Sequence, residues 1–276
     1  LSKYSGTIGG AKEFECPKQR RIDDYDSKLK EFRNNLEVEI DFENSEEKCT
    51  KNPGHAGFIP VKELKTSHFP VNYQDQDLVD SVKLLGELTV KVSVSVAEGV
   101  RTASGKIIDI TQNLHNIKCP CSGCMDSKNP RENWWEIEIL TVTHIVKEDA
   151  KNSKCRLFYD TSDSSLVNVE GLRVVNSSQN SDICRLICIT CDEALSNRIS
   201  GMLDKSSELY EKVFEKFWDV KNAEKLVVIV SHPHGTPKKV TIGKSDERKE
   251  ISDGHSVLTY STNTCPGSAG AFLYIL

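Results

Sequence analysis

The sequence of 276 residues lacks the features that define several large classes of protein. It has no apolar run of about 18 residues, the length of a membrane-spanning helix, and its first residues lack the apolar core of a secretory signal. Its 36 basic and 41 acidic residues are interspersed, so there is no basic stripe of the kind that binds nucleic acid. We therefore expect neither a membrane nor a nucleic-acid partner, and a cytoplasmic location is favoured over an oxidising one.

Ten cysteines are present, but they do not have the spacing of a small disulfide scaffold. Cys119, Cys121 and Cys124 bring three thiols together, and with a fourth ligand from His115 or from a thiol on another strand they would form a structural zinc site. Disulfides and packing as small apolar side chains are the alternatives. Cys184 and Cys188 share one face of a predicted strand, where core packing is the commoner role.

The chain divides by pattern into four parts. Residues 1–75 form a polar, irregular N-terminal extension with one expected helix at 24–36, and we assign this part no chemistry. Residues 76–200 are expected to form a first barrel with a cysteine-rich insertion, 201–225 a connecting helix and 226–276 a partial second barrel.

The predicted barrel depends on short segments of period two. Residues 88–95 alternate valine or leucine with polar residues, which is typical of a half-buried strand. Further strands are predicted at 103–110, 139–146, 155–160 and 172–175, separated by turn-forming residues. Helical periodicity is found at 75–85 and again from an expected cap at Asp204 to about residue 220.

Three stretches carry candidate chemistry. The apolar run 139–146 contains His144, the apolar run 183–189 is preceded by Asp182, and a turn of small residues, 264–271, enters the last predicted strand. A lone histidine in an apolar run is most often a structural residue. The order histidine, aspartate, glycine-flanked turn is nevertheless one of the known chain orders of a catalytic triad.

With these residues, positions 88–276 resemble the trypsin-like peptidase superfamily, in particular its compact, divergent members. Residues 140–146 are similar to the Thr-Ala-Ala-His signature of that family, although both alanines are replaced, and 182–187 resemble its Asp-Ile-x-Leu-Leu segment. Residues 232–235 resemble the Pro-x-Gly turn that opens the second barrel. The resemblance implies a mostly β, two-barrel antiparallel chymotrypsin-like fold. Because the chain starts at Leu1 and ends within an apolar run, we expect a truncated second barrel and a chain that has been cut short.

The resemblance also assigns roles to residues. His144 would act as general base, Asp182 would orient it, and a serine of the turn would attack a peptide carbonyl, with no cofactor required for catalysis. The family turn is Gly-x-Ser-Gly, whereas this chain reads Gly267, Ser268, Ala269, Gly270. In the family register Ala269 occupies the nucleophile position, and the amides of Gly267 and Ala269 form the oxyanion hole.

Shifting the register by one residue makes Ser268 the nucleophile but places Pro266, which has no N–H, in the oxyanion hole. Losing one oxyanion donor costs about 10²–10³ in turnover, and losing a triad nucleophile costs on the order of 10⁶. Three functions follow: a serine peptidase that uses Ser268, a pseudoenzyme that binds peptides or proteins, and a zinc-stabilised interaction protein. The first is the leading interpretation and the second its main alternative, because the family register, which keeps both glycines of the turn, leaves the chain without its nucleophile.

Overall fold

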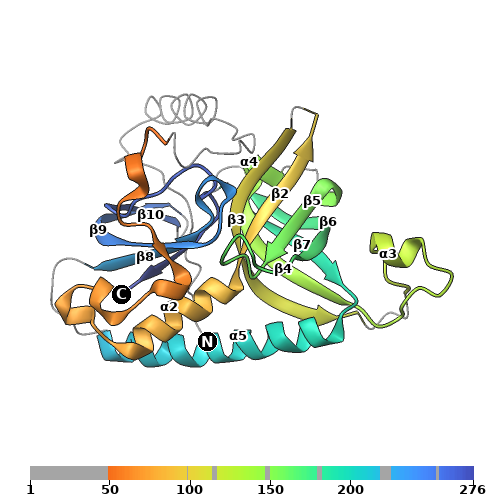
Figure 1. The fold of residues 1–276 in the computed structure, drawn as a ribbon, viewed down its shortest axis with the longest axis horizontal. Coiled ribbons are helices and arrows are strands. Elements are labelled where there is room, and N and C mark those ends of the chain that lie inside the picture. Colours follow the sequence, from red (N-terminus) through yellow and green to blue (C-terminus); the bar gives the residue numbers. More distant parts are fainter. Residues whose placement is uncertain are drawn as a thin grey trace.

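The computed structural model describes seven stretches of the chain: 49–97, 99–113, 117–146, 150–178, 182–217, 225–252 and 255–276. The expected helix at 24–36 and the candidate ligand His115 lie outside these stretches. The ribbon in Figure 1 separates into a barrel, a second sheet, and two helices along one side of both.

The barrel is closed and antiparallel, with the strand order β2-β3-β4-β7-β6-β5. Its strands are β2 (Thr89–Val96), β3 (Gly99–Gln112), β4 (Trp135–Val142), β5 (Ser153–Leu157), β6 (Val167–Ser178) and β7 (Ile183–Thr190). The alternation in β2 has the expected effect, because Val90, Val92 and Val94 are fully buried in the barrel core. The prediction of a mostly β fold with an antiparallel first barrel is therefore confirmed.

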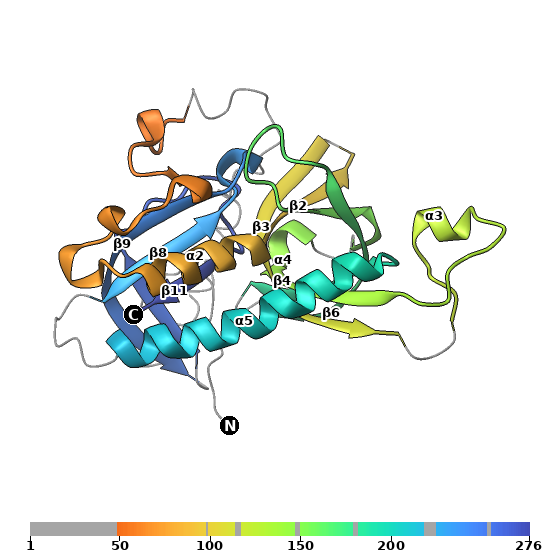
Figure 2. The same ribbon diagram turned by 60° about the horizontal axis from the view of Figure 1, so that its bottom comes forward.

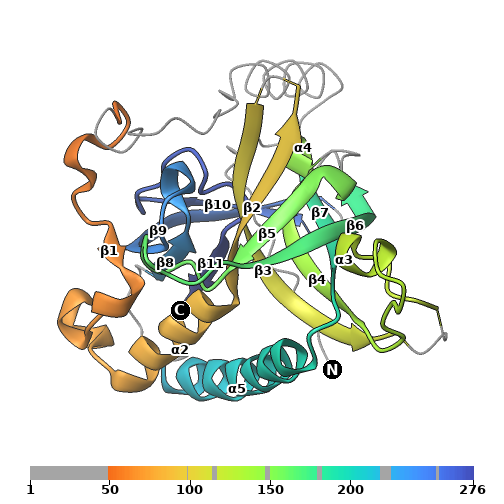
Figure 3. The same cartoon turned by 45° about the vertical axis from the view of Figure 1, so that its right-hand side comes forward.

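The second sheet has five strands, in the order β1-β9-β8-β11 with β10 paired to β9. They are β1 (Ile59–Pro60), β8 (Leu226–Ser231), β9 (Lys239–Ser252), β10 (His255–Tyr260) and β11 (Phe272–Ile275). All of the pairings are antiparallel. Four of its strands come from residues 226–276, the part expected to form the partial second barrel, and Figure 3 shows β1 beside β9.

Within the described part of the expected N-terminal extension, residues 59–73 pack with the second sheet. This part of the chain forms the short 3-10 turns η1 (Pro53–His55), η2 (Val61–Glu63), η3 (Thr66–His68) and η4 (Val71–Tyr73). Leu64 and Phe69 are buried in the second core, together with the inner face of α2 (Gln76–Leu88). The expected boundaries assign this helix to the first barrel, but most of its buried apolar residues pack in the second core.

Helix α5 (Glu193–Phe217) joins the two cores. Ile199 is buried in the barrel core, whereas Val213 and Phe217 are buried in the second core, so the helix runs under both units (Figures 1 and 2). The helix begins earlier than the expected Asp204. The side chain of Asp192 accepts a hydrogen bond of 3.1 Å from the Leu195 amide and so caps the helix there.

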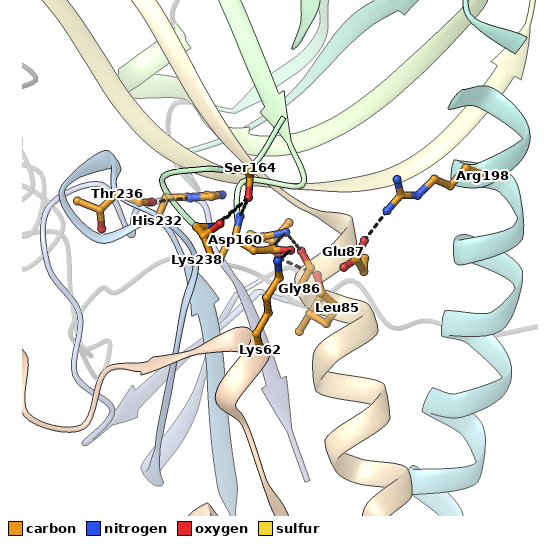
Figure 4. Close-up of polar contacts among 12 residues, drawn as sticks. Lys62, Leu85, Gly86, Glu87, Asp160, Ser164, Arg198, His232, Thr236 and Lys238 are labelled. Atoms are coloured by element: carbon orange, nitrogen blue, oxygen red, sulfur yellow. Dashed lines mark hydrogen bonds and ion pairs between the residues drawn. The ribbon is translucent and has the colours of Figure 1, made fainter. Parts of the chain in front are cut away.

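A buried ion pair also links the units (Figure 4). Lys238, between η6 (Pro233–Gly235) and β9, is fully buried, and its Nζ lies 2.9 Å from Asp160 Oδ1 in the connection between β5 and β6. Nζ also donates a 2.6 Å hydrogen bond to the carbonyl oxygen of Gly86 near the end of α2. One ammonium group therefore connects the barrel, the second sheet and α2.

None of the helices that the structure describes combines the length and the apolar character needed to cross a membrane.

Candidate active site

His144 lies just after the strand that was expected to contain it. Strand β4 ends at Val142, and Thr143–Val146 form the single helical turn α4 rather than a continuation of the strand. The change occurs where the β7 partner strand begins, because Val142 pairs with Ile183 and the Thr143 amide donates a 3.1 Å bond to the Asp182 carbonyl oxygen. The ladder therefore brings the end of β4 to the residue that precedes β7.

At this junction Asp182 contacts His144 in two ways. One carboxylate oxygen accepts a 2.9 Å hydrogen bond from the His144 backbone amide, and the other contacts the ring nitrogen Nδ1. Asp182 has a left-handed backbone conformation (φ 53°), which aspartate adopts more readily than most residues. A carboxylate at Nδ1 favours the tautomer with the proton there, so Nε2 keeps its lone pair available as a base. The side chains are 23% and 32% exposed, so both remain accessible from solvent.

The turn that follows Cys265 lies between the barrel and the second sheet, and Ser104 of β3 holds it in place. The Ser104 amide donates to the Ala269 carbonyl oxygen (2.8 Å), and its hydroxyl donates to the Gly267 carbonyl oxygen (2.8 Å). The Ser104 carbonyl oxygen in turn accepts a 2.8 Å bond from the Thr141 hydroxyl, three residues before His144. The turn is thereby fixed beside the end of β4.

Both glycines of the turn are required by its geometry. Gly267 and Gly270 have φ of +83° and +80°, in the region that glycine adopts without strain. A Cβ on Gly270 would lie 2.3 Å from the Ser104 carbonyl oxygen, and one on Gly267 would lie 2.5 Å from the His232 carbonyl oxygen. Gly270 therefore packs against the barrel and Gly267 against the connection between β8 and β9.

The two central residues of the turn point to different sides. The Ser268 hydroxyl is buried and lies 3.0 Å from the Ser231 hydroxyl at the end of β8, and it also accepts a 3.4 Å bond from the Cys265 amide. Ala269 packs against the barrel core. Ser268 is thus engaged with the second sheet, whereas Ala269 contacts the barrel.

The amide nitrogens of Gly267 and Ala269 donate no backbone hydrogen bond within the described part of the chain outside the strand pairings. These are the two donors that the family register assigns to the oxyanion hole. Ser104 and Ser231, which hold the turn, were not singled out from the sequence. A serine within a strand has no local feature that distinguishes it from any other polar residue of that strand.

The cysteines of the insertion lie close together, far from this site. Cys119, Cys121 and Cys124 meet Cys191, which follows β7, with all four sulfurs within 4.8 Å of one another. The fourth member is thus a thiol from another strand, one of the two alternatives left open by the sequence. Figures 1 and 2 show α3 (Ser122–Met125) on the side of the barrel away from the second sheet.

The immediate surroundings of these thiols differ. Burial raises the pKa of Cys119 and of Cys191, whereas a hydrogen bond from the Arg131 backbone lowers the pKa of Cys124. Cys184 and Cys188 are core residues instead. Burial raises the pKa of Cys184 to about 12, and the Cys188 sulfur lies 3.6 Å from that of Cys155.

The described residues thus form a mostly β fold with a closed antiparallel barrel, a histidine after the third strand of that barrel and a contacting aspartate before its sixth. This is the first barrel expected for a chymotrypsin-like fold, and a second antiparallel sheet follows it.

In sequence, the chain matches no protein-family model and no curated protein. In structure, it is similar to the crystal structure of Deg5, with 14% identity over 72% of this chain and 79% of that one and a TM-score of 0.42. It is also similar to the Rv3671c protease from M. tuberculosis in its active form, with 14% identity over 72% and 70% of the two chains and a TM-score of 0.39. A third match, the HtrA-type protease AlgW with tripeptide, has 12% identity over 70% and 49% and a TM-score of 0.41. At such values these likenesses carry no weight for activity.

Proposed function

We propose that this chain is a serine-protease-fold protein that binds peptides or proteins at the junction of barrel and second sheet, and that it does not cleave them. In this proposal Ala269 occupies the nucleophile position. His144 and Asp182 keep the arrangement of the general base and its orienting acid, but they have no hydroxyl to deprotonate.

The observation that carries the proposal is the engagement of the Ser268 hydroxyl. A nucleophilic serine must donate its proton to the base, and this hydroxyl is instead buried against Ser231 and the Cys265 amide. Turning it toward His144 would break both contacts and leave the Ser231 hydroxyl without this partner, which costs about 1–3 kcal/mol for a buried polar group.

The features that support ligand binding are separate from the missing nucleophile. The amides of Gly267 and Ala269 make no backbone hydrogen bond in the described part of the chain outside the strand pairings, and in this proposal they donate to a carbonyl or carboxylate oxygen of a peptide. The turn that presents them is fixed to the barrel by Ser104 and does not need to reorganise when a ligand binds. A peptide whose C-terminal carboxylate is placed at these amides is the simplest ligand of this class.

A serine-reactive fluorophosphonate probe separates this function from an active peptidase. We expect no labelling of the unmodified chain or of Ser268→Ala, and labelling of Ala269→Ser, because the added hydroxyl would face the existing base. Ala269→Ser combined with His144→Gln is the matched control and should lose the labelling. Labelling of the unmodified chain that disappears in Ser268→Ala would overturn the proposal and establish the peptidase.

Binding needs its own measurement, because a missing label does not demonstrate a ligand. We expect the backbone amide resonances of Gly267 and Ala269 to shift when unstructured peptides with free C-terminal carboxylates are titrated into the unmodified chain. C-terminally amidated forms of the same peptides serve as controls and should bind more weakly. If no peptide shifts these amides, the binding function is excluded.

We also propose that Cys119, Cys121, Cys124 and Cys191 hold a structural zinc ion. Four thiols from two segments, with the Cys124 and Cys191 sulfurs 4.0 Å apart, fit the closed four-ligand type of site, which has no open position for a substrate. Its role would be to fold the insertion, which has only a small core of its own around the buried Trp134.

A further inference from the structure

A second group of metal-binding side chains lies beside the candidate active site. Cys49, His55, His234 and Cys265 each offer one ligand atom, and all four atoms lie within 4.8 Å of one another. The Cys265 sulfur is 3.5 Å from the Cys49 sulfur and 3.4 Å from His55 Nε2. The rings of His55 and His234 have centroids 5.1 Å apart.

The four residues come from two distant parts of the chain. Cys49 and His55 lie around η1, within the predicted N-terminal extension. His234 lies in η6, and Cys265 lies at the start of the turn that contains Ser268. His234 is also tied directly to that turn, because its amide donates a 2.7 Å hydrogen bond to the Pro266 carbonyl oxygen.

The sulfur atoms receive hydrogen bonds of the kind that support thiolate ligands. The Asn52 backbone amide donates to the Cys49 sulfur (3.3 Å), and the Asn52 side-chain amide donates to the Cys265 sulfur (3.2 Å). N–H donors around a metal ligand fix its orientation and stabilise its charge. The same side-chain amide donates to the Thr264 carbonyl oxygen at 2.9 Å, so Asn52 also fixes the spacing between the two segments.

The sulfurs are too far apart for a disulfide, whose S–S bond is about 2.05 Å. Packing of buried apolar side chains does not by itself explain why the four residues converge either. Cys49, His234 and Cys265 are buried, but an apolar contact does not require two thiols and two imidazoles to converge on one point. Two thiolates and two neutral imidazoles would together balance the charge of one Zn²⁺ ion and supply the soft and borderline ligands that it prefers.

We propose that Cys49, His55, His234 and Cys265 form a structural zinc site that fastens the segment around η1 to the turn preceding Ser268. With four protein ligands the site is closed, so the metal takes no part in chemistry. It shapes the turn, since Cys265 is separated from Gly267 only by Pro266. This site is independent of whether the chain cleaves or only binds peptides.

The test is metal analysis of the purified full chain and of two matched variants. If both cysteine sites are filled, the unmodified chain should carry two zinc equivalents. Cys49→Ser should remove one of them, and Cys191→Ser in the other cluster should remove the other. Unchanged zinc in Cys49→Ser, together with the expected loss in Cys191→Ser, would overturn the proposal.

Cobalt substitution identifies which ligands are used. With Co²⁺ as the probe, Cys191→Ser should retain the visible absorption of a tetrahedral site with two sulfur and two nitrogen ligands, and His55→Ala should weaken it. If Cys49→Ser fails to fold, His55→Ala, which leaves both sulfurs in place, should still show reduced metal content. A Cys49–Cys265 disulfide found by mass spectrometry of unreduced protein purified under nitrogen would exclude the zinc site.

Discussion

The hydroxyl of Ser268, in the turn before β11, lies 3.0 Å from the hydroxyl of Ser231, the last residue of β8. Both residues are buried. The pair therefore contributes to the stability of the turn, and this contribution can be measured apart from any activity.

We expect Ser268→Ala and Ser231→Ala each to lower the free energy of unfolding by about 1–3 kcal/mol, because each leaves one buried hydroxyl without its partner. The double variant should cost less than the sum, with a coupling energy of about 1 kcal/mol. Chemical denaturation of the parent, the two single variants and the double variant gives the free energies of this double-mutant cycle. Strictly additive effects would show that the two hydroxyls do not interact.

The contact between Asp182 and His144 predicts a spectroscopic signature. The Nδ1 proton held against a carboxylate should give a strongly downfield proton resonance, which is absent in His144→Gln. Asp182→Asn should move this resonance upfield, because a neutral amide oxygen is a weaker acceptor than a carboxylate. An unchanged resonance in Asp182→Asn would mean that another residue accepts the proton.

The buried pair of Lys238 and Asp160 predicts a large stability effect (Figure 4). Burial lowers the pKa of Lys238 despite the adjacent carboxylate, so the ammonium group depends on Asp160 to remain charged. Lys238→Met should cost about 3–5 kcal/mol by leaving a buried carboxylate uncompensated. Adding Asp160→Asn should restore much of this loss.

The exposed ion pair between Glu87 and Arg198 in the same region is the matched control. Glu87→Gln should change the free energy of unfolding by less than about 1 kcal/mol. Equal effects of Glu87→Gln and Lys238→Met would show that burial does not strengthen the dependence of Lys238 on its partner.

Lys106 predicts a pH dependence of stability in the alkaline range. Burial lowers its pKa to about 8, with Nζ 3.8 Å from the centroid of the Phe272 ring. In the unfolded chain a lysine titrates near pH 10.4. Between about pH 8 and pH 10.4 Lys106 carries a proton in more of the unfolded molecules than of the folded ones. It therefore makes the free energy of unfolding rise with pH, by at most about 3 kcal/mol.

The measurement is denaturant unfolding from pH 7 to 10 for the parent chain and for Lys106→Met. Burial raises the pKa of Tyr274 to about 12, so this tyrosine makes stability fall above about pH 10 in both proteins. The free energy of unfolding of the parent minus that of Lys106→Met isolates the contribution of the lysine. This difference should increase as pH rises from 7 to 10, and a difference that does not change with pH would contradict the lowered pKa of Lys106.

The barrel strands and two of the candidate site residues could be predicted from the sequence because their signals are local. The alternation at 88–95 follows from the two-residue period of a strand with one buried face, and it is found in β2. His144 and Asp182 were identified because each lies at the end of an apolar run. That the two ends meet is decided by the antiparallel pairing of Val142 with Ile183.

The core on which α2 packs and the residue at which α5 begins could not be predicted from the sequence, because both depend on packing against another element of the fold. An amphipathic helix shows that one face is buried but not against what, and α2 was therefore assigned to the wrong core. Asp192 and Asp204 are both acceptable caps. The helix begins after Asp192, because the packing of Ile199 against the barrel stabilises the helical turns between Asp192 and Asp204.

The sequence by itself determined which residue types are available: a histidine, an aspartate, a turn with alanine after serine, and cysteines in separate groups. Only the tertiary structure decided that the Ser268 hydroxyl belongs to Ser231 and that Cys49 lies beside Cys265, 216 positions further along the chain. Local patterns extend over a few residues, whereas such contacts are selected by the packing of two cores against each other, and no periodicity in the chain encodes them.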